Sequence, residues 1–364
     1  MLDKNPIIKK RTEPFKELQS LAAPYAGNCA PDHEKLDVQG NCNCDCDCRC
    51  NCDCYETEDC DCDCLQSFCD CNCVCDCGAL EDGVLYIQPG AKKIFASTYS
   101  GRKEIRKVVL PEGLEEIGDS AFKGCTSLEE IHFPESLKEI GSYAFDECKN
   151  LRSIVLPNTN LKIHQRAFCL CGIREITIPD AITELPYEPF YASDITTVHI
   201  GKGLSKWGGG EFNKCSKLHT ITVDEENPYF KVVRGVLYSK DGKTLYFYPP
   251  AREGKTFTVP DGVETIGKCA FYYNRGLEKV YLPDGFTTIE RDAFCYAALS
   301  EISLPKSIRL FKEAAFGFCQ NLTRVNFRGK KKDCRFKIDG SWVFPVNKYG
   351  ERATFSTEDA AWGI

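Results

Sequence analysis

The sequence feature that most constrains the fold is a motif that returns every 22 or 23 residues. It reads LPEGLEEIGDSAFKGC from Leu110 to Cys125 and FPESLKEIGSYAFDEC from Phe133 to Cys148. Counted from Phe122, the phenylalanines of successive copies lie 23, 23, 22, 22, 59, 23 and 22 residues apart. A fixed period of this length is typical of a solenoid, in which each coil buries its apolar side only against neighbouring coils. The longest step therefore indicates one coil plus an insertion.

Each copy contains one strand signal and one turn signal. In SLEEIHFP, Leu128, Ile131 and Phe133 are apolar while polar residues alternate with them, which predicts a short strand with one buried face. In the segment that follows, Gly141 permits a turn, and SYAF predicts a short helix or 3-10 turn whose phenylalanine fills the interior. The looser copies carry their phenylalanine pair at Ala167-Phe168, Pro189-Phe190, Ala270-Phe271, Ala293-Phe294 and Ala315-Phe316, with Glu211-Phe212 as a degenerate member.

The full pattern, I-x-LP-x-x-L-x-x-I-G-x-x-A-F-x-x-C-x-x-L, resembles the BspA-type leucine-rich repeat proteins from Ile105 to about Phe327. The resemblance implies an α/β solenoid, a curved leucine-rich-repeat superhelix of about eight coils. It implies short parallel strands on one side and turns, short helices or 3-10 turns on the other. It also implies a bacterial protein, often secreted or at the cell surface, that binds partner proteins or extracellular matrix.

Composition changes along the chain divide it into regions. We expect a flexible N-terminal arm at 1–41, a Cys-x-Cys low-complexity tract at 42–77, an N-terminal cap at 78–104, the solenoid at 105–327 and a C-terminal cap at 328–364. Trp342, Phe344 and Trp362 are candidates to close the C-terminal end of the core.

The insertion at 224–255 reads as a β-hairpin. Two alternating segments flank Lys240-Asp241-Gly242, and Asp-Gly is a strong hairpin signal. Its tyrosines, Tyr229, Tyr238, Tyr246 and Tyr248, leave two interpretations: an aromatic binding finger, or a hairpin packed on the flank of the stack. We favour the packed hairpin.

The cysteines are very unevenly distributed, since fifteen of the 25 fall within Cys42 to Cys77. These fifteen form three runs of alternating cysteine, separated by YETED and LQSF. Within a run, an extended backbone puts every sulfur on one face and the intervening residues, mostly Asp, Asn or Arg, on the other. The tract has almost no apolar residues and cannot build a core of its own. Its candidate metal ligands are Cys42, Cys44, Cys46, Cys48, Cys50, Cys52, Cys54, Cys60, Cys62, Cys64, Cys69, Cys71, Cys73, Cys75 and Cys77.

Three interpretations of this tract stay open. The first is a thiolate cluster holding Zn, Cu or an Fe-S centre, because Cys-x-Cys pairs chelate soft ions. The tract resembles metallothioneins in cysteine density, with Asp where those proteins usually have lysine. The second is a precursor-type segment that is covalently modified or disulfide cross-linked, with the repeats as docking domain. The third is a low-complexity expansion without a specific function.

The cysteines of the repeats belong to a different population. Cys125, Cys148, Cys171, Cys215 and Cys319 occupy one slot, three residues after the phenylalanine, which Ser193, Asn274 and Ala297 fill in other copies. A slot that accepts these residues favours a small side chain. We therefore expect buried structural thiols there.

The net charge and the lack of known catalytic motifs argue against several classes of function. The net charge of -7 gives no basic footprint for nucleic acid, and the sequence has no apolar run long enough to span a membrane. It also has no H-E-x-x-H, G-x-S-x-G or phosphate-binding loop, so we predict that the protein is not an enzyme. The first thirty residues lack the apolar core of a secretory signal, which favours a cytoplasmic location. The family resemblance favours a secreted or cell-surface one instead.

The outward positions of the predicted strands form a polar ribbon. Repeat proteins use such surfaces to bind partner proteins. The alternative, to which we give equal weight, is that these residues are polar only because any exposed strand face must be polar. The candidate partner-binding residues are Glu130, His132, Glu175, Thr177, Thr197, His199, Thr222, Lys279, Tyr281 and Arg324.

Overall fold

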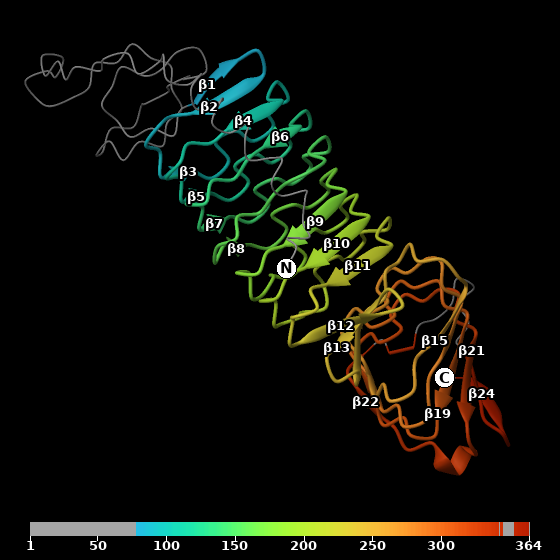
Figure 1. The fold of residues 1–364 in the computed structure, drawn as a ribbon. Helices are drawn as coiled ribbons and strands as arrows, with labels where there is room; N and C mark the ends of the chain where they lie inside the picture. The colour runs from blue at the N-terminus through green and yellow to red at the C-terminus, as the bar shows by residue number, and fades with distance from the viewer. Residues whose placement is uncertain (1–77, 342, 345–352, 364) are drawn as a thin grey trace, which may run out of the picture. The chain divides into compact units, whose positions relative to one another are not determined.

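The computed structural model describes residues 78–341, 343, 344 and 353–363, all of which lie in one compact unit of the chain. They form a β-solenoid of about 11 turns, which confirms the predicted solenoid (Figure 1). The arm at 1–41 and the Cys-x-Cys tract at 42–77 lie outside the described residues.

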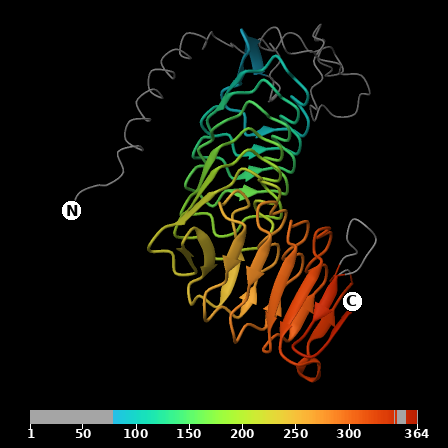
Figure 2. The same cartoon turned by 90° about the vertical axis from the view of Figure 1, so that its right-hand side faces the viewer.

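Most coils contribute one strand to a first ladder, at the LEEIHF segment of the motif, and the coil after Phe145 contributes an isolated bridge from Ser153 to Glu175. Neighbouring strands pair in parallel, with β1–β2 and β23–β24 antiparallel at the two ends. Figure 1 shows β9, β10 and β11 side by side, and Figure 2 shows the same arrangement for the strands drawn in orange to red. The first ladder consists of β1 (Gly78–Glu81), β2 (Val84–Ile87), β4 (Lys107–Val109) and β6 (Glu130–Ile131); β9 (Glu175–Ile178), β10 (Thr197–Ile200) and β11 (Thr220–Val223); and β15 (Thr256–Thr258), β17 (Lys279–Tyr281), β19 (Glu301–Pro305), β21 (Arg324–Arg328), β23 (Thr354–Ser356) and β24 (Ala361–Gly363).

A second ladder lies where the sequence analysis placed only turns or short helices, at the LKEIG segment. In the described residues no α-helix occurs, and the one 3-10 helix is Lys331–Asp333. The expectation of short helices is therefore wrong in this detail: the phenylalanine lies in a turn. The second ladder consists of β3 (Lys93–Ile94), β5 (Glu116–Ile117), β7 (Glu139–Ile140) and β8 (Lys162–Ile163); and β12 (Phe230–Val233), β13 (Val236–Ser239), β14 (Thr244–Phe247), β16 (Thr265–Ile266), β18 (Thr288–Ile289), β20 (Leu310–Lys312) and β22 (Lys337–Asp339).

The motif phenylalanines form a continuous stack inside the solenoid. Ring centroids of Phe122 and Phe145 lie 5.3 Å apart at 10°, and those of Phe145 and Phe168 lie 5.3 Å apart at 3°. The backbone N–H of Phe145 donates to the carbonyl of Ala167 in the next coil at 2.7 Å. Since aromatic pairs contribute about 0.5–1.5 kcal/mol beyond their burial, the stack repeats one favourable contact at each coil.

The glycine of the motif permits close approach rather than a turn. A Cβ on Gly141 would lie 2.5 Å from the backbone nitrogen of Asp119, and one on Gly118 would lie 2.8 Å from that of Ala96. Neither glycine is among those with positive φ. The prediction that Gly141 is needed for a turn is therefore wrong about the cause. The neighbouring coil excludes a side chain at this position, and the local backbone does not.

The cysteine slot is a hydrogen-bonding position as well as a small one. The Cys148 thiol donates to the carbonyl of Phe122 at 3.2 Å, and the Cys171 thiol donates to that of Phe145 at 3.0 Å. Ser193 makes the same bond to Phe168 at 2.7 Å. Burial raises the pKa of the Cys125 thiol to about 12, so it stays protonated and able to donate.

Both ends of the repeat extend further than the sequence analysis placed them. Tyr99 occupies the ring position of a coil inside the expected N-terminal cap and stacks on Phe122 at 5.4 Å. At the other end, Phe344 stacks on Phe316 at 5.3 Å. Trp342 lies outside the described residues, and only the backbone of Trp362 is described, in β24.

The insertion starts the second ladder of the C-terminal half. β12, β13 and β14 are antiparallel neighbours, and β14 pairs in parallel with β16. Tyr238 and Tyr248 are buried, and Tyr229 is exposed. The hairpin is thus part of the solenoid wall. Buried Asn227 fixes its start, donating to the carbonyls of Gly201 and Leu204 and accepting from two backbone N–H groups.

Replacement of Cys171 tests the hydrogen-bonding slot. We expect Cys171→Ser to keep the bond and Cys171→Ala to lower the free energy of unfolding by about 1 kcal/mol relative to it, because the donor to Phe145 is lost. The cost stays small because the backbone N–H of Cys148 also donates to that carbonyl. Urea unfolding measures the difference.

Ala297 supplies the reverse control, since it fills the same slot without a donor. Ala297→Cys is expected to leave stability unchanged or raise it slightly. Equal stabilities of Cys171→Ser and Cys171→Ala would show that the slot selects size alone.

Candidate interaction surface

The predicted partner-binding residues all lie in, or directly after, strands of the first ladder. The structure divides them among three sheets rather than one ribbon. Glu130 and His132 belong to the sheet that ends at β6, and Lys279, Tyr281 and Arg324 lie on β17 and β21. The remaining five, Glu175, Thr177, Thr197, His199 and Thr222, share the sheet of β9 to β11.

His199 is the centre of the largest predicted group. Its Nε2 lies 3.0 Å from Oε1 of Glu175, and its Nδ1 lies 2.6 Å from Oγ1 of Thr222. Parallel register places Thr177 and Thr222 on either side of His199, and Thr197 beside Glu175. Sites that perform chemistry on small molecules are concave, whereas this group lies on an exposed sheet face. It therefore suits recognition of polar groups on a large partner.

The other two groups are ion-pair networks. Near β6, Nζ of Lys107 lies 2.9 Å from Oε1 of Glu130, which is 3.5 Å from Nδ1 of His132. On the C-terminal sheet, Glu301 is paired with Lys279 at 3.3 Å and with Arg324 at 3.0 Å. These networks orient the predicted side chains across neighbouring coils.

Beside the C-terminal network, the amide of Asn326 donates to Glu301 at 2.8 Å and accepts from Ser356 at 2.6 Å. Tyr281 is 42% exposed, the largest aromatic surface among the predicted residues. The sequence analysis did not single out Glu301, Asn326 or Ser356, because only the register between coils brings them together.

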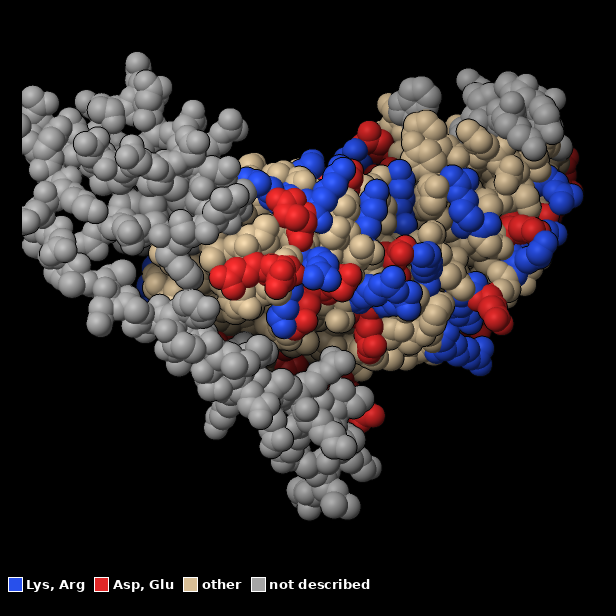
Figure 3. Space-filling model, turned by 90° about the horizontal axis from the view of Figure 1, so that it is seen from above, with Lys and Arg blue, Asp and Glu red and all other residues tan. Residues whose placement is uncertain are grey.

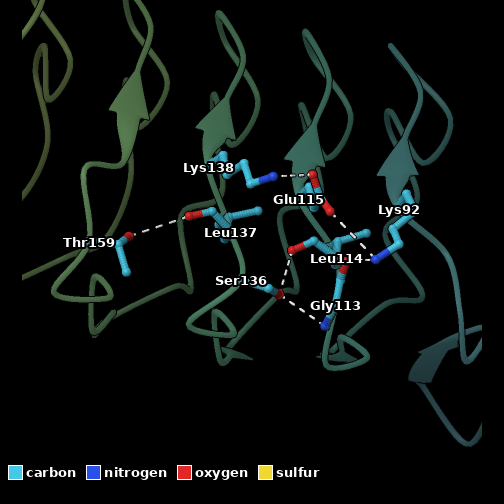
Figure 4. A network of polar contacts seen from close by, with 8 residues as sticks. All are labelled: Lys92, Gly113, Leu114, Glu115, Ser136, Leu137, Lys138 and Thr159. Atoms are coloured by element: carbon cyan, nitrogen blue, oxygen red, sulfur yellow. Dashed lines mark hydrogen bonds and ion pairs between the residues drawn. The ribbon is translucent and has the colours of Figure 1, made fainter.

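The second ladder carries a comparable network, drawn in Figure 4. Glu115 lies between Lys92, at 3.5 Å, and Lys138, and its hydrogen bond to Lys138 lowers the pKa of the carboxyl group. The Ser136 hydroxyl donates to the carbonyl of Leu114 at 2.7 Å. Exposed pairs of this kind typically contribute about 0–1 kcal/mol each, so they order the surface more than they stabilise it.

Charges of both signs are interleaved on the surface. Figure 3 shows Lys and Arg side chains next to Asp and Glu side chains across the described part of that face. The pattern follows from residues such as Lys93 and Glu116, which occupy matching positions in successive coils and pair at 2.8 Å. Such a face offers both donors and acceptors to a partner.

Comparison with protein families identifies the family to which the repeat belongs. The model for the BspA type leucine rich repeat region matches in 6 copies, over residues 138–232 and 246–335. These ranges cover just over half of the chain. The chain belongs to the BspA-type leucine-rich repeat family.

Solved structures with the same repeat agree with this assignment. A leucine-rich repeat protein from Eubacterium ventriosum ATCC 27560 is 28% identical, with a TM-score of 0.62 over 70% of each chain. The pneumococcal vaccine antigen PcpA is 22% identical, with a TM-score of 0.51 over 76% of this chain and 69% of its own, which shows the fold alone. No curated protein matches the chain.

The leucine-rich repeat coils display aromatic residues that the sequence analysis missed. Tyr273, Tyr296 and Phe318 all lie two residues after the ring of their coil, and Phe318 is 52% exposed. The signal was present in the sequence, because Gly101 and Gly124 fill the same slot in earlier coils. A slot that accepts both glycine and aromatic residues is not a core position.

The buried carboxylates of Glu188 and Glu211 both have structural partners. Glu188 accepts from Nε of Arg166 at 2.8 Å and from Asn213 at 3.2 Å. Glu211 accepts from the backbone N–H groups of Gly208, Gly209 and Gly210, the last at 2.8 Å. Glu211, which stands where the motif has alanine, thus holds the glycine-rich bend at 208–210 in place.

The nine cysteines of the described residues are free, and all but Cys334 are buried. Within the same residues no cluster of three or more His, Cys, Asp or Glu side chains is placed to hold a metal ion. The predicted metal ligands Cys42 to Cys77 lie outside the described part of the chain. A search of the described residues for a helix long and apolar enough to cross a membrane finds none.

Glu211 makes stability depend on pH. Burial raises the pKa of its carboxyl group above the ordinary 4.5, and the backbone N–H groups only partly offset this. A raised folded-state pKa favours folding while the group is protonated, so its contribution is lost as pH rises from about 4.5 through the folded-state value.

We therefore expect Glu211→Gln, which cannot ionise, to lose less stability than the natural chain over that pH range. Urea unfolding at pH 4 to 8 measures this. Parallel pH profiles for the two proteins would contradict the assignment.

Proposed function

We propose that this leucine-rich repeat protein is a non-enzymatic scaffold that binds a partner protein through the first ladder. The observation that supports this most directly is the group of Glu175, His199 and Thr222, whose polar atoms are linked across three neighbouring strands on an exposed face. Side chains held in place before binding lose less conformational entropy when a partner arrives.

The Glu301 network supports the same function in the C-terminal half. Lys279, Arg324 and Asn326 converge on one carboxylate, next to exposed Tyr281. Tyrosine and arginine are enriched among the residues that dominate protein–protein binding energy. Repeat proteins bind partners on such extended surfaces because successive coils present successive side chains.

Site-specific photo-crosslinking tests this proposal. A photoreactive amino acid at Thr222 should capture a defined protein from the native cells. Capture should fall when Glu175 and His199 are replaced by alanine, because the prearranged polar group is removed. These exposed substitutions should leave the free energy of unfolding within about 0.5 kcal/mol, so lost capture would report binding.

Thr288 on β18 provides the matched control, because it holds an outward position in the second ladder. The same probe at Thr288 should not capture that protein. Identical captured proteins from both positions, or capture that survives the double alanine variant, would contradict the first ladder as the interface.

We further propose that the tract from Cys42 to Cys77 binds thiophilic metal ions such as Zn or Cu, or an Fe-S centre. The alternation of cysteine with mostly Asp, Asn and Arg in each of three runs supports this, because an extended run of that pattern presents all its sulfurs on one side. Thiolate ligation requires reduced cysteines, so this proposal goes together with a cytoplasmic location. Covalent modification or disulfide cross-linking of the same tract, with the repeats as docking domain, is the competing function.

Metal analysis and intact mass of protein purified under reducing conditions distinguish the two. Several equivalents of metal that disappear when all fifteen tract cysteines are changed to serine would support metal binding. Cys148→Ser, in the repeat, is the control and should lose none. Less than one equivalent in the natural chain would rule the cluster out, and a mass change confined to the tract would favour modification.

A further inference from the structure

The coils share a second surface, on the turn that follows the ring. We call the second residue after each ring the turn-edge slot. Its backbone is left-handed in every member named here, with φ between 53° and 76°. In chain order these residues are Gly101, Gly124, Glu147, Leu170, Ala192, Lys214, Tyr273, Tyr296 and Phe318.

Aromatic residues are costly choices for this slot. The left-handed region favours glycine, and a bulky residue held there bears strain of about 1–3 kcal/mol. Gly101 and Gly124 show that the coil forms without a side chain at this position. The other non-glycine members of the slot share this left-handed conformation, so the strain is common to the slot. What distinguishes Tyr273, Tyr296 and Phe318 is that three successive coils place an aromatic ring there.

The rings lie against one another and form a continuous row. Tyr296 and Phe318 stack at 4.6 Å with 5° between their planes, and Tyr273 lies 6.4 Å from Tyr296. Tyr272, in the neighbouring slot, meets Tyr296 edge-on at 5.9 Å. Tyr296 and Phe318 turn their faces toward each other, so this pair presents its edges, which carry the positive end of the ring quadrupole.

Cations extend the row from Tyr273 toward the N-terminal half. The guanidinium of Arg275 lies 4.4 Å from the Tyr273 ring centroid, and the ammonium of Lys214 lies 5.6 Å from it. Lys214 also lies 5.0 Å from the ring of Tyr191, whose hydrogen bond raises the pKa of the lysine. These cations cover ring faces and add positive charge beside the ring edges.

We propose that the aromatic row, defined as Tyr273, Tyr296 and Phe318 with Lys214 and Arg275, binds an acidic segment of a partner polypeptide. Ring edges, phenol hydroxyls and two cations all favour carboxylate oxygens, and the exposed ring of Phe318 favours an apolar side chain beside them. This surface is separate from the first ladder, so the inference does not rest on the proposed function.

Other polymers fit the row less well. Stacking of nucleic-acid bases requires free aromatic faces, and Tyr296 covers one face of Phe318 while Arg275 lies over the ring of Tyr273. A short acidic segment with apolar residues matches the local chemistry, and Tyr, Phe and Arg are enriched in protein interfaces.

The glycines at this slot define the test variant. Replacing Tyr273, Tyr296 and Phe318 with glycine copies the residue of Gly101 and Gly124, removes the rings and relieves the backbone strain. We expect the thermal unfolding midpoint to stay within about 5 °C of the natural protein, since lost ring contacts and relieved strain offset each other. Glu147→Gly makes the same backbone change outside the row and is the matched control.

The binding probe is a displayed library of random 12-residue peptides, selected on the intact protein. Enriched peptides should combine Asp or Glu with apolar residues, and they should bind the triple-glycine variant at least about tenfold more weakly. Glu147→Gly should bind as the natural protein does. Lys214→Glu with Arg275→Glu should weaken binding while leaving the rings in place.

Three results would overturn the proposal. The first is enrichment of peptides without acidic residues, or of none. The second is equal binding of the enriched peptides to the triple-glycine variant. The third is tighter binding of a heparin fragment or a single-stranded oligonucleotide than of any selected peptide, which would reassign the row to a polyanion. Unaltered binding in the Glu175 and His199 variants would separate this surface from the first ladder.

Discussion

The stack of phenylalanine rings is the contact on which the rest of the structure depends. Each ring is held by a neighbour on either side, and its backbone N–H is bonded to the next coil, as Phe145 shows with Ala167. A coil isolated from its neighbours would expose that ring and leave that N–H without its partner. The strands, the thiol slot and the outward side chains all take their register from this repeated contact.

The period of the phenylalanines was enough to predict the solenoid, the family resemblance implied its parallel strands, and Asp241-Gly242 predicted the hairpin turn. The second ladder was missed because strands of two residues, such as β5 and β7, are too short to show alternation. Contacts between coils were also invisible in the sequence. Gly141 was assigned to a local turn, although the constraint comes from Asp119 in the preceding coil.

The candidate interaction surface, too, could be predicted from the sequence only in part. Outward positions could be identified from strand alternation, and the predicted residues do lie on the first ladder. The sequence could not show that Glu175, His199 and Thr222 meet while Glu130 belongs to another sheet, because that depends on which strands pair. The mixture of glycine and aromatic residues at the turn-edge slot was visible in the sequence, but its left-handed backbone and the contacts between its rings are visible only in the structure.

The ring stack is regular except at the insertion. Phe190 and Phe212 are nearly parallel at 5°, but Phe212 meets Phe247 at 55°, and the buried apolar residues fall into two clusters that adjoin there. Each coil of a solenoid is stabilised by its neighbours, so the cooperativity of unfolding between coils is limited by the junction with the weakest contacts. We therefore expect the described residues to unfold as two cooperative blocks. Amide hydrogens at their common boundary should exchange faster than those in the middle of either block.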